Sequence, residues 1–208
     1  MINVIFDMDG TLIDSANAIV CAVNEIRTDL NLEPLKREFI LDTINTPGQN
    51  YAKIFYGVDT YSHTSFKEGY EKYFIKHYDQ SVVLFDGVLE VLEFCKKNDC
   101  YLAIATNAPQ ESLVPILKKQ NILSYFDKIL GVSYGMEAKP DPMMLRLIAD
   151  EAKYEKSIFI GDSLKDRLCA KNAKMDYIHI SWQKETKDLD EVNDKTTLIE
   201  KIQTHMKG

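Results

Sequence analysis

Asp7-Met8-Asp9-Gly10-Thr11 follows directly on the apolar run Val4-Ile5-Phe6. An uninterrupted run of β-forming residues that ends in two acids and a glycine predicts a buried strand followed by a functional turn. Alternate side chains of an extended segment point the same way, so we expect Asp7 and Asp9 to face a common ligand. Carboxylates at that spacing repel each other unless a cation or a shared proton lies between them. An isolated Asp-x-Asp is usually a solvated loop, but the burial of the preceding strand argues against that interpretation.

Length and composition are those of a soluble globular protein. The 208 residues suffice for one sizeable core, or for a core with a small insertion, and the hydrophobic fraction of 45% is ordinary. A net charge of -7 does not favour a nucleic-acid partner or an anionic membrane. No apolar run reaches membrane-spanning length, and the four cysteines form no Cys-x-x-Cys pair, which favours free thiols over zinc or disulfides. We therefore expect a cytoplasmic protein.

The pattern of apolar residues divides the chain into two kinds of segment. Residues 15–81 show helical spacing and no convincing strand, whereas from residue 82 expected strands at 101–105, 128–132, 157–160 and 177–180 alternate with helices. Such alternation predicts an α/β fold with a doubly wound parallel sheet. Because the helical segment interrupts it after the first strand, we expect a discontinuous core of residues 1–14 and 82–208 and an inserted α-helical domain of residues 15–81.

Polar side chains follow several of the expected strands. Asp7 and Asp9 come after the first strand, Thr106-Asn107 after another and Asp162 after a third. Lys139 lies in the loop Lys139-Pro140-Asp141-Pro142, where the following proline favours an extended backbone. Ligands of a doubly wound sheet bind beyond the carboxyl ends of its strands. We therefore interpret these groups as parts of one site.

The order of these motifs resembles that of the haloacid dehalogenase-like (HAD) hydrolases. Phe6–Ser15 is similar to the first motif of the branch that contains phosphoglycolate phosphatases and β-phosphoglucomutases. The later motifs follow in the family's order and are Ala105-Thr106-Asn107, Lys139-Pro140-Asp141-Pro142 and Gly161-Asp162-Ser163 with Asp166. The resemblance covers the whole core and implies a HAD-like Rossmannoid fold. The helical insertion matches the family's cap only in position, length and helical character.

The resemblance implies a Mg²⁺-dependent phosphatase that hydrolyses a small phosphorylated metabolite, of the phosphoglycolate type or a sugar phosphate, through an aspartyl-phosphate. Asp7 would be the nucleophile, and Asp9 would protonate the leaving group and then activate water. The ligands of Mg²⁺ would be the Asp7 carboxylate, the Asp9 backbone carbonyl and Asp162, with Asp166 supporting from the outer coordination shell.

Further groups of the same motifs would hold the phosphate. Thr106 would hydrogen-bond the phosphoryl group together with backbone N–H groups near Gly10 and Asn107, and Lys139 would supply a compact positive charge. Each has an ordinary alternative: Asn107 is equally well a turn residue, Ser163 is equally well a helix cap, and an isolated Lys139 would be a solvated surface charge.

Two other functions stay open at this point. A phosphomutase of the β-phosphoglucomutase type would use the same core, and a non-catalytic regulatory member would use the fold alone, although that class is expected to lack one of the acids or Lys139. The expected partner is a small phosphate ester, with no nucleic acid or membrane, and the expected state is a monomer or weak homodimer. One departure from the branch is Ala173-Lys174, where Ala-Gly is common, so a helix ends there without the usual left-handed glycine.

Overall fold

The structure is a computed structural model that describes residues 1–59, 64–182 and 191–207. For 64–71 and 191 it describes the backbone only. The chain forms two compact units. Met1–Ile13 and Leu84–Gly208 make one, which we call the core unit, and Asp14–Val83 make the other, which we call the insert unit.

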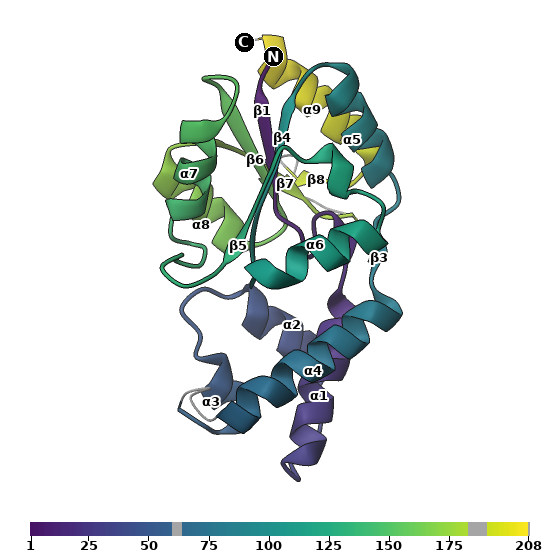
Figure 1. Ribbon diagram of the computed structural model, residues 1–208, viewed down its shortest axis with the longest axis vertical. Coiled ribbons are helices and arrows are strands. Elements are labelled where there is room, and N and C mark those ends of the chain that lie inside the picture. The colour runs from purple at the N-terminus through teal and green to yellow at the C-terminus, as the bar shows by residue number, and fades with distance from the viewer. Residues whose placement is uncertain (60–63, 183–190, 208) are drawn as a thin grey trace. The chain divides into compact units, whose positions relative to one another are not determined.

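A parallel sheet is the centre of the core unit (Figure 1). Among the described residues its strand order is β5-β4-β1-β6-β7-β8, and every neighbouring pair is parallel. This confirms the predicted fold class. Strand β1 lies between two neighbours and is buried along its whole length, which explains the apolar run Val4-Ile5-Phe6 within it. The strands are β1 (Asn3–Phe6), β4 (Tyr101–Pro109), β5 (Lys128–Val132), β6 (Ser157–Gly161), β7 (Asp176–Ile180) and β8 (Glu191–Val192).

Helices cover both faces of this sheet (Figure 1). The pair α7 and α8 packs on one face, and the pair α5 and α9 packs on the other. The register places Ile5 beside Ala103 and Phe159, and these three side chains pack against the apolar side of α7. The helices are α5 (Val88–Lys97), α6 (Gln110–Lys119), α7 (Met143–Glu151), α8 (Leu164–Ala173) and α9 (Lys195–Lys207), with a short 3₁₀ turn at Leu123–Tyr125.

The insert unit is helical. It contains α1 (Ala16–Asp29), α2 (Arg37–Asn45), α3 (Tyr51–Tyr56) and α4 (Thr64–Ser81). Apolar residues at helical spacing meet in a small core of its own, made by Val23, Ile26, Ile40, Phe55 and Tyr56. The connecting segments β2 (Ile13–Asp14) and β3 (Val83–Leu84) pair as a separate two-stranded sheet.

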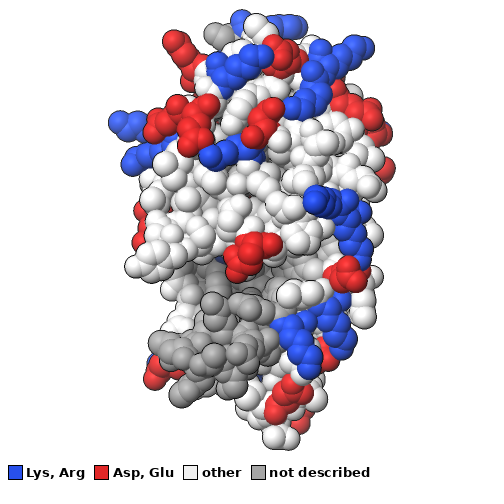
Figure 2. Space-filling view, viewed as in Figure 1, with Lys and Arg blue, Asp and Glu red and all other residues white. Residues whose placement is uncertain are grey.

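The exposed charges of the core unit are of both signs. On the face drawn in Figure 2, Lys and Arg side chains of the core unit are interspersed with Asp and Glu. In the ranges that the structure describes, none of the helices has both the length and the apolar character needed to cross a bilayer.

Helix α8 is followed by its C-cap residue Lys174, which takes the left-handed conformation with φ of 58°. That conformation crowds the Cβ of any residue except glycine. We expect Lys174→Gly to raise the free energy of unfolding by about 0.5–1 kcal/mol in urea denaturation. Lys171→Gly is the matched control, because it places glycine inside the same helix and is expected to lower stability by about 1 kcal/mol. A loss of stability in both variants would contradict the assignment of strain to Lys174.

Candidate functional site

The register of the sheet places the predicted polar residues at one edge. Phe6, the last residue of β1, lies beside Ile104 of β4 and Ile160 of β6. Asp7 follows Phe6, and its backbone N–H donates to the carbonyl of Ile160 at 2.8 Å. Thr106 and Asp162 each follow two residues after the strand partners of Phe6. Parallel strands therefore deliver all three residues to the same carboxyl edge.

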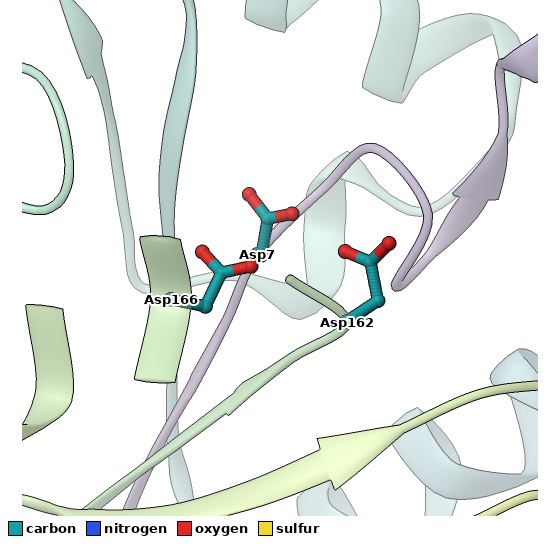
Figure 3. A group of neighbouring side chains, drawn as sticks. All are labelled: Asp7, Asp162 and Asp166. Carbon is teal, nitrogen blue, oxygen red and sulfur yellow. The ribbon is translucent and has the colours of Figure 1, made fainter. Parts of the chain in front are cut away.

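Three carboxylates gather at this edge. Asp7, Asp162 and Asp166 each offer an oxygen atom, and these atoms lie within 4.8 Å of one another. Figure 3 shows Asp7 after the purple strand β1, Asp166 on helix α8 next to it, and Asp162 on the loop after β6. Asp7 and Asp166 are only 6% and 1% exposed, so the cluster carries charge that water solvates poorly.

Lys139 joins two of these carboxylates. Its ammonium donates to Asp7 Oδ1 at 2.5 Å and to Asp166 Oδ1 at 2.6 Å, and the residue is 5% exposed. The ammonium also lies 5.3 Å from the centre of the Phe159 ring. The lysine is therefore a buried part of the cluster and not a solvated surface charge, and within the cluster a single ammonium faces three carboxylates.

The pKa values of the acids reflect their burial first and this charge imbalance second. Burial raises the pKa of Asp7 well above its usual range, and the charges of Asp166 and Asp162 add to the rise against the opposing Lys139. Burial and then the Asp166 charge raise the pKa of Asp162 to about 7. Burial would lower the pKa of Lys139, but Asp166 and Asp7 outweigh it and hold that pKa above its ordinary value. The lysine is thus cationic, and the raised pKa values of Asp7 and Asp162 show that its single charge does not balance the acids when they are ionised.

These residues fit a divalent cation. The donors are carboxylate oxygens, which hard cations such as Mg²⁺ prefer, and the surplus negative charge is what a divalent ion would neutralise. Asp166 is already committed, since its Oδ1 accepts from Lys139 and its Oδ2 accepts from the Ser163 backbone N–H at 3.1 Å. Asp7 and Asp162 are therefore the carboxylates best placed to hold the ion directly. Ser163 forms a capping box with Asp166 at the start of α8, which gives that serine a structural role.

The loop after β1 brings Gly10 and Thr11 against Asp162. Gly10 has φ of 83°, and a Cβ on it would lie 2.6 Å from Cγ of Asp162. Only glycine permits both the conformation and this close approach. Thr11 Oγ1 donates to Asp162 Oδ1 at 3.3 Å, which links the loop to the acidic cluster. Asp9 lies in the same loop, after the buried Met8, and is partly exposed.

Asn107 has a role that the sequence did not reveal. Its side-chain Oδ1 accepts from the Lys139 backbone N–H at 2.7 Å, and its Nδ2 donates to the Lys139 carbonyl at 3.1 Å. This pair of hydrogen bonds fixes the backbone of the lysine. The neighbouring Thr106 is 1% exposed, and its Oγ1 accepts from the Ala108 N–H at 3.2 Å where the register of β4 shifts. No local sequence pattern predicts the contact between Asn107 and Lys139, because the two residues are 32 positions apart.

We expect Asn107→Ala to lower the free energy of unfolding by about 1–3 kcal/mol, because it leaves the backbone N–H and carbonyl of Lys139 without their partners. Asn172→Ala is the matched control. Asn172 Nδ2 donates to the Pro140 carbonyl in the same loop, but the bond is exposed, so water can replace it. Urea denaturation of both variants measures the difference. Equal losses of unfolding free energy in the two variants would show that the hydrogen bonds of Asn107 to the Lys139 backbone contribute no more than an exposed bond.

The chain is similar to known proteins both in sequence and in structure. The sequence profile of the haloacid dehalogenase-like hydrolases matches residues 4–180. The chain is 32% identical over 192 residues to a Colwellia psychrerythraea protein named phosphoglycolate phosphatase, covering 86% of this chain and 83% of that protein. It is 28% identical over 183 residues to pyrophosphatase PpaX of Listeria monocytogenes, with coverage of 86% and 82%. The crystal structure of a predicted phosphatase from Clostridium acetobutylicum matches with a TM-score of 0.82 at 24% identity, covering 98% of both chains.

Proposed function

The chain belongs to the haloacid dehalogenase-like hydrolase family, as its motifs predicted, and we propose that it is a Mg²⁺-dependent phosphatase that acts through an aspartyl-phosphate on Asp7. The observation that carries the proposal is the meeting of the Lys139 ammonium with the buried carboxylates of Asp7 and Asp166, beside Asp162, at the ligand-binding edge of the sheet. The similarity to proteins named phosphoglycolate phosphatase and pyrophosphatase supports chemistry at a phosphoryl group.

Asp7 is the proposed nucleophile. One of its carboxylate oxygens forms a bond to phosphorus while the bond from phosphorus to the ester oxygen breaks, and Asp9 gives its proton to that leaving oxygen. Asp9 then takes a proton from a water molecule. The resulting hydroxide attacks phosphorus, which releases inorganic phosphate and restores the Asp7 carboxylate.

Charge neutralisation is the second requirement, because both the phosphate ester and Asp7 are anionic. A Mg²⁺ ion held by Asp7, the Asp9 carbonyl and Asp162 would supply positive charge to the nucleophile and the phosphoryl oxygens. The Lys139 ammonium, fixed by Asn107 through its backbone, adds a second positive charge. Thr106 and the backbone N–H groups near Gly10 and Asn107 are proposed to hydrogen-bond the phosphoryl oxygens.

The insert unit is proposed to act as a helical cap that covers the ester and excludes water during the first step. A small phosphorylated metabolite, such as phosphoglycolate or a sugar phosphate, is the substrate class we propose. Specificity would lie in the cap and its loops, because the core supplies only the chemistry common to phosphoryl transfer.

The test is phosphate release from phosphoglycolate, sugar phosphates, nucleotides and pyrophosphate, each with Mg²⁺ and with a chelator. We expect release from at least one ester with Mg²⁺ and none with the chelator. Release that is equal under the two conditions would refute the metal requirement. Isomerisation of a hexose phosphate without phosphate release, followed by NMR, would identify a phosphomutase in place of a phosphatase.

A further inference from the structure

Strand β7 ends beside the loop that carries Asp162. The hydroxyl of Tyr177, on β7, donates to the Gly161 carbonyl at 2.8 Å and lies 3.4 Å from the Ser163 carbonyl. These two carbonyls flank Asp162 in the chain. The same hydroxyl lies 3.0 Å from His179 Nδ1, so it can donate to Gly161 while it accepts from the imidazole N–H. The backbone on either side of Asp162 is therefore held by one phenol.

The position of the Tyr177 ring is itself fixed by packing. Its centre lies 6.1 Å from that of the Phe159 ring on β6, and the Arg167 guanidinium lies over it at 5.9 Å. Contacts on the ring leave the hydroxyl little freedom to move away from the Gly161 carbonyl. Tyr177 thus connects β7 to the Asp162 loop through a side chain whose position is fixed by packing.

Trp182, which follows β7, reaches the other loop of the site. Its indole N–H donates to the Thr11 carbonyl at 2.7 Å. Its ring stacks on Phe85 with centres 5.9 Å apart and planes 19° apart, and the Phe85 backbone N–H donates to the Leu12 carbonyl at 3.1 Å. Two successive carbonyls of the loop after Asp9 are therefore tied to this aromatic pair.

We infer that Tyr177 and Trp182 are positioning residues that together set the distance between Asp162 and the loop carrying Asp7 and Asp9. The inference rests on the proposed function, because it concerns the geometry of the Mg²⁺ ligands. Neither side chain is hydrogen-bonded to a carboxylate of the cluster. Tyr177 acts on the Gly161 carbonyl, next to Asp162, and Trp182 acts on the Thr11 carbonyl, two residues after Asp9. Mg²⁺ requires near-octahedral ligands at about 2.0–2.1 Å, so small displacements of either loop weaken its binding.

Tyr177→Phe and Trp182→Phe test this role. Tyr177→Phe keeps the ring and removes the hydroxyl, with its bonds to Gly161 and His179. Trp182→Phe keeps an aromatic ring beside Phe85 but removes the indole N–H together with part of the ring system. Tyr154→Phe is the matched control, because the Tyr154 hydroxyl also donates to a backbone carbonyl, that of Asp99, while its own backbone is bonded to Asn3 at the start of β1, far along the strand from the site. Isothermal titration of the metal-free proteins with Mg²⁺ is the readout, and circular dichroism melting reports whether each variant folds.

We expect the dissociation constant for Mg²⁺ to rise about tenfold in Tyr177→Phe and in Trp182→Phe, and to stay unchanged in Tyr154→Phe. Unchanged affinity in both site variants, with the wild type binding Mg²⁺, would overturn the inference. A variant that fails to melt cooperatively is set aside, and the remaining one decides the outcome by the same criterion.

Amide hydrogen exchange of the metal-free proteins separates this inference from the proposed function. Trp182→Phe is expected to speed exchange at the Leu12 and Ile13 amides, which bond to the Met8 carbonyl, and Tyr177→Phe at the Ser163 amide. If the wild type binds no Mg²⁺, the proposed function fails. Exchange then decides the positioning role by itself: faster exchange at these amides supports it, and rates equal to those of the wild type contradict it.

Discussion

Asp7→Asn is expected to abolish Mg²⁺-dependent phosphate release while the protein remains folded. An amide cannot form the aspartyl-phosphate, so we expect kcat to fall by about 10⁴-fold or more. Phosphate release from the best ester of the panel, measured with excess Mg²⁺, is the direct readout. Asp141→Asn is the matched control. Asp141 lies in the Lys139 loop, but its carboxylate accepts an exposed hydrogen bond from the Met143 backbone N–H. Its activity is expected to stay near that of the wild type.

The same variant separates chemistry from folding. Burial raises the pKa of Asp7, which means that its ionised form is held in the fold at a cost. A neutral amide removes that cost, and Lys139 keeps its hydrogen bond to Asp166. We therefore expect the metal-free Asp7→Asn variant to be at least as stable as the wild type in urea. Undiminished phosphate release by a well-folded Asp7→Asn protein would end the proposal that Asp7 is the nucleophile.

Lys139→Met is expected to cause the largest loss of stability. Methionine fills similar volume beside Phe159, but it leaves the buried carboxylates of Asp7 and Asp166 without their ammonium. Breaking a buried ion pair by removing one partner costs about 3–5 kcal/mol. Urea denaturation of the metal-free protein at neutral pH measures this loss, and phosphate release is expected to disappear with it.

The double variant Lys139→Met with Asp166→Asn checks the cause. It removes the lysine together with one of the stranded carboxylates, so we expect it to recover a large part of the stability that the single variant loses. Recovery of this kind is a coupling between neighbouring residues and is read from a double-mutant cycle. Additive losses in the two single variants and the double variant would show that the ion pairs are not the reason for the instability.

The sequence was informative where function depends on strand ends. An apolar run followed by Asp7, and a second such run followed by Asp162, were enough to predict that the two acids share one edge, because parallel strands in register end together. The family resemblance added Lys139, whose loop position alone does not predict burial. The sequence predicted that α8 ends at Ala173-Lys174 without a glycine, but it did not predict that Lys174 itself takes the left-handed conformation.

Other features of the site depend on tertiary contacts that leave no local pattern. The clamp of Asn107 on the Lys139 backbone and the hydrogen bond from Trp182 to Thr11 join residues 32 and 171 positions apart. Strand β8 has no apolar alternation to reveal it, because it is two residues long and extends the sheet beside β7 through backbone pairing. Hydrogen bonds to backbone groups require only a donor or acceptor at the right place, so many residue types would serve and none is distinctive.

The central claim is that Asp7 carries the phosphoryl group between the two steps. Asp9→Asn with p-nitrophenyl phosphate and Mg²⁺ tests it most directly, because this leaving group needs no protonation whereas the second step still requires the base. We predict a burst of one equivalent of p-nitrophenol followed by slow turnover, and mass spectrometry of the acid-quenched protein should place one phosphoryl group on Asp7. Steady release without a burst, or a phosphoryl group on another residue, would contradict the account.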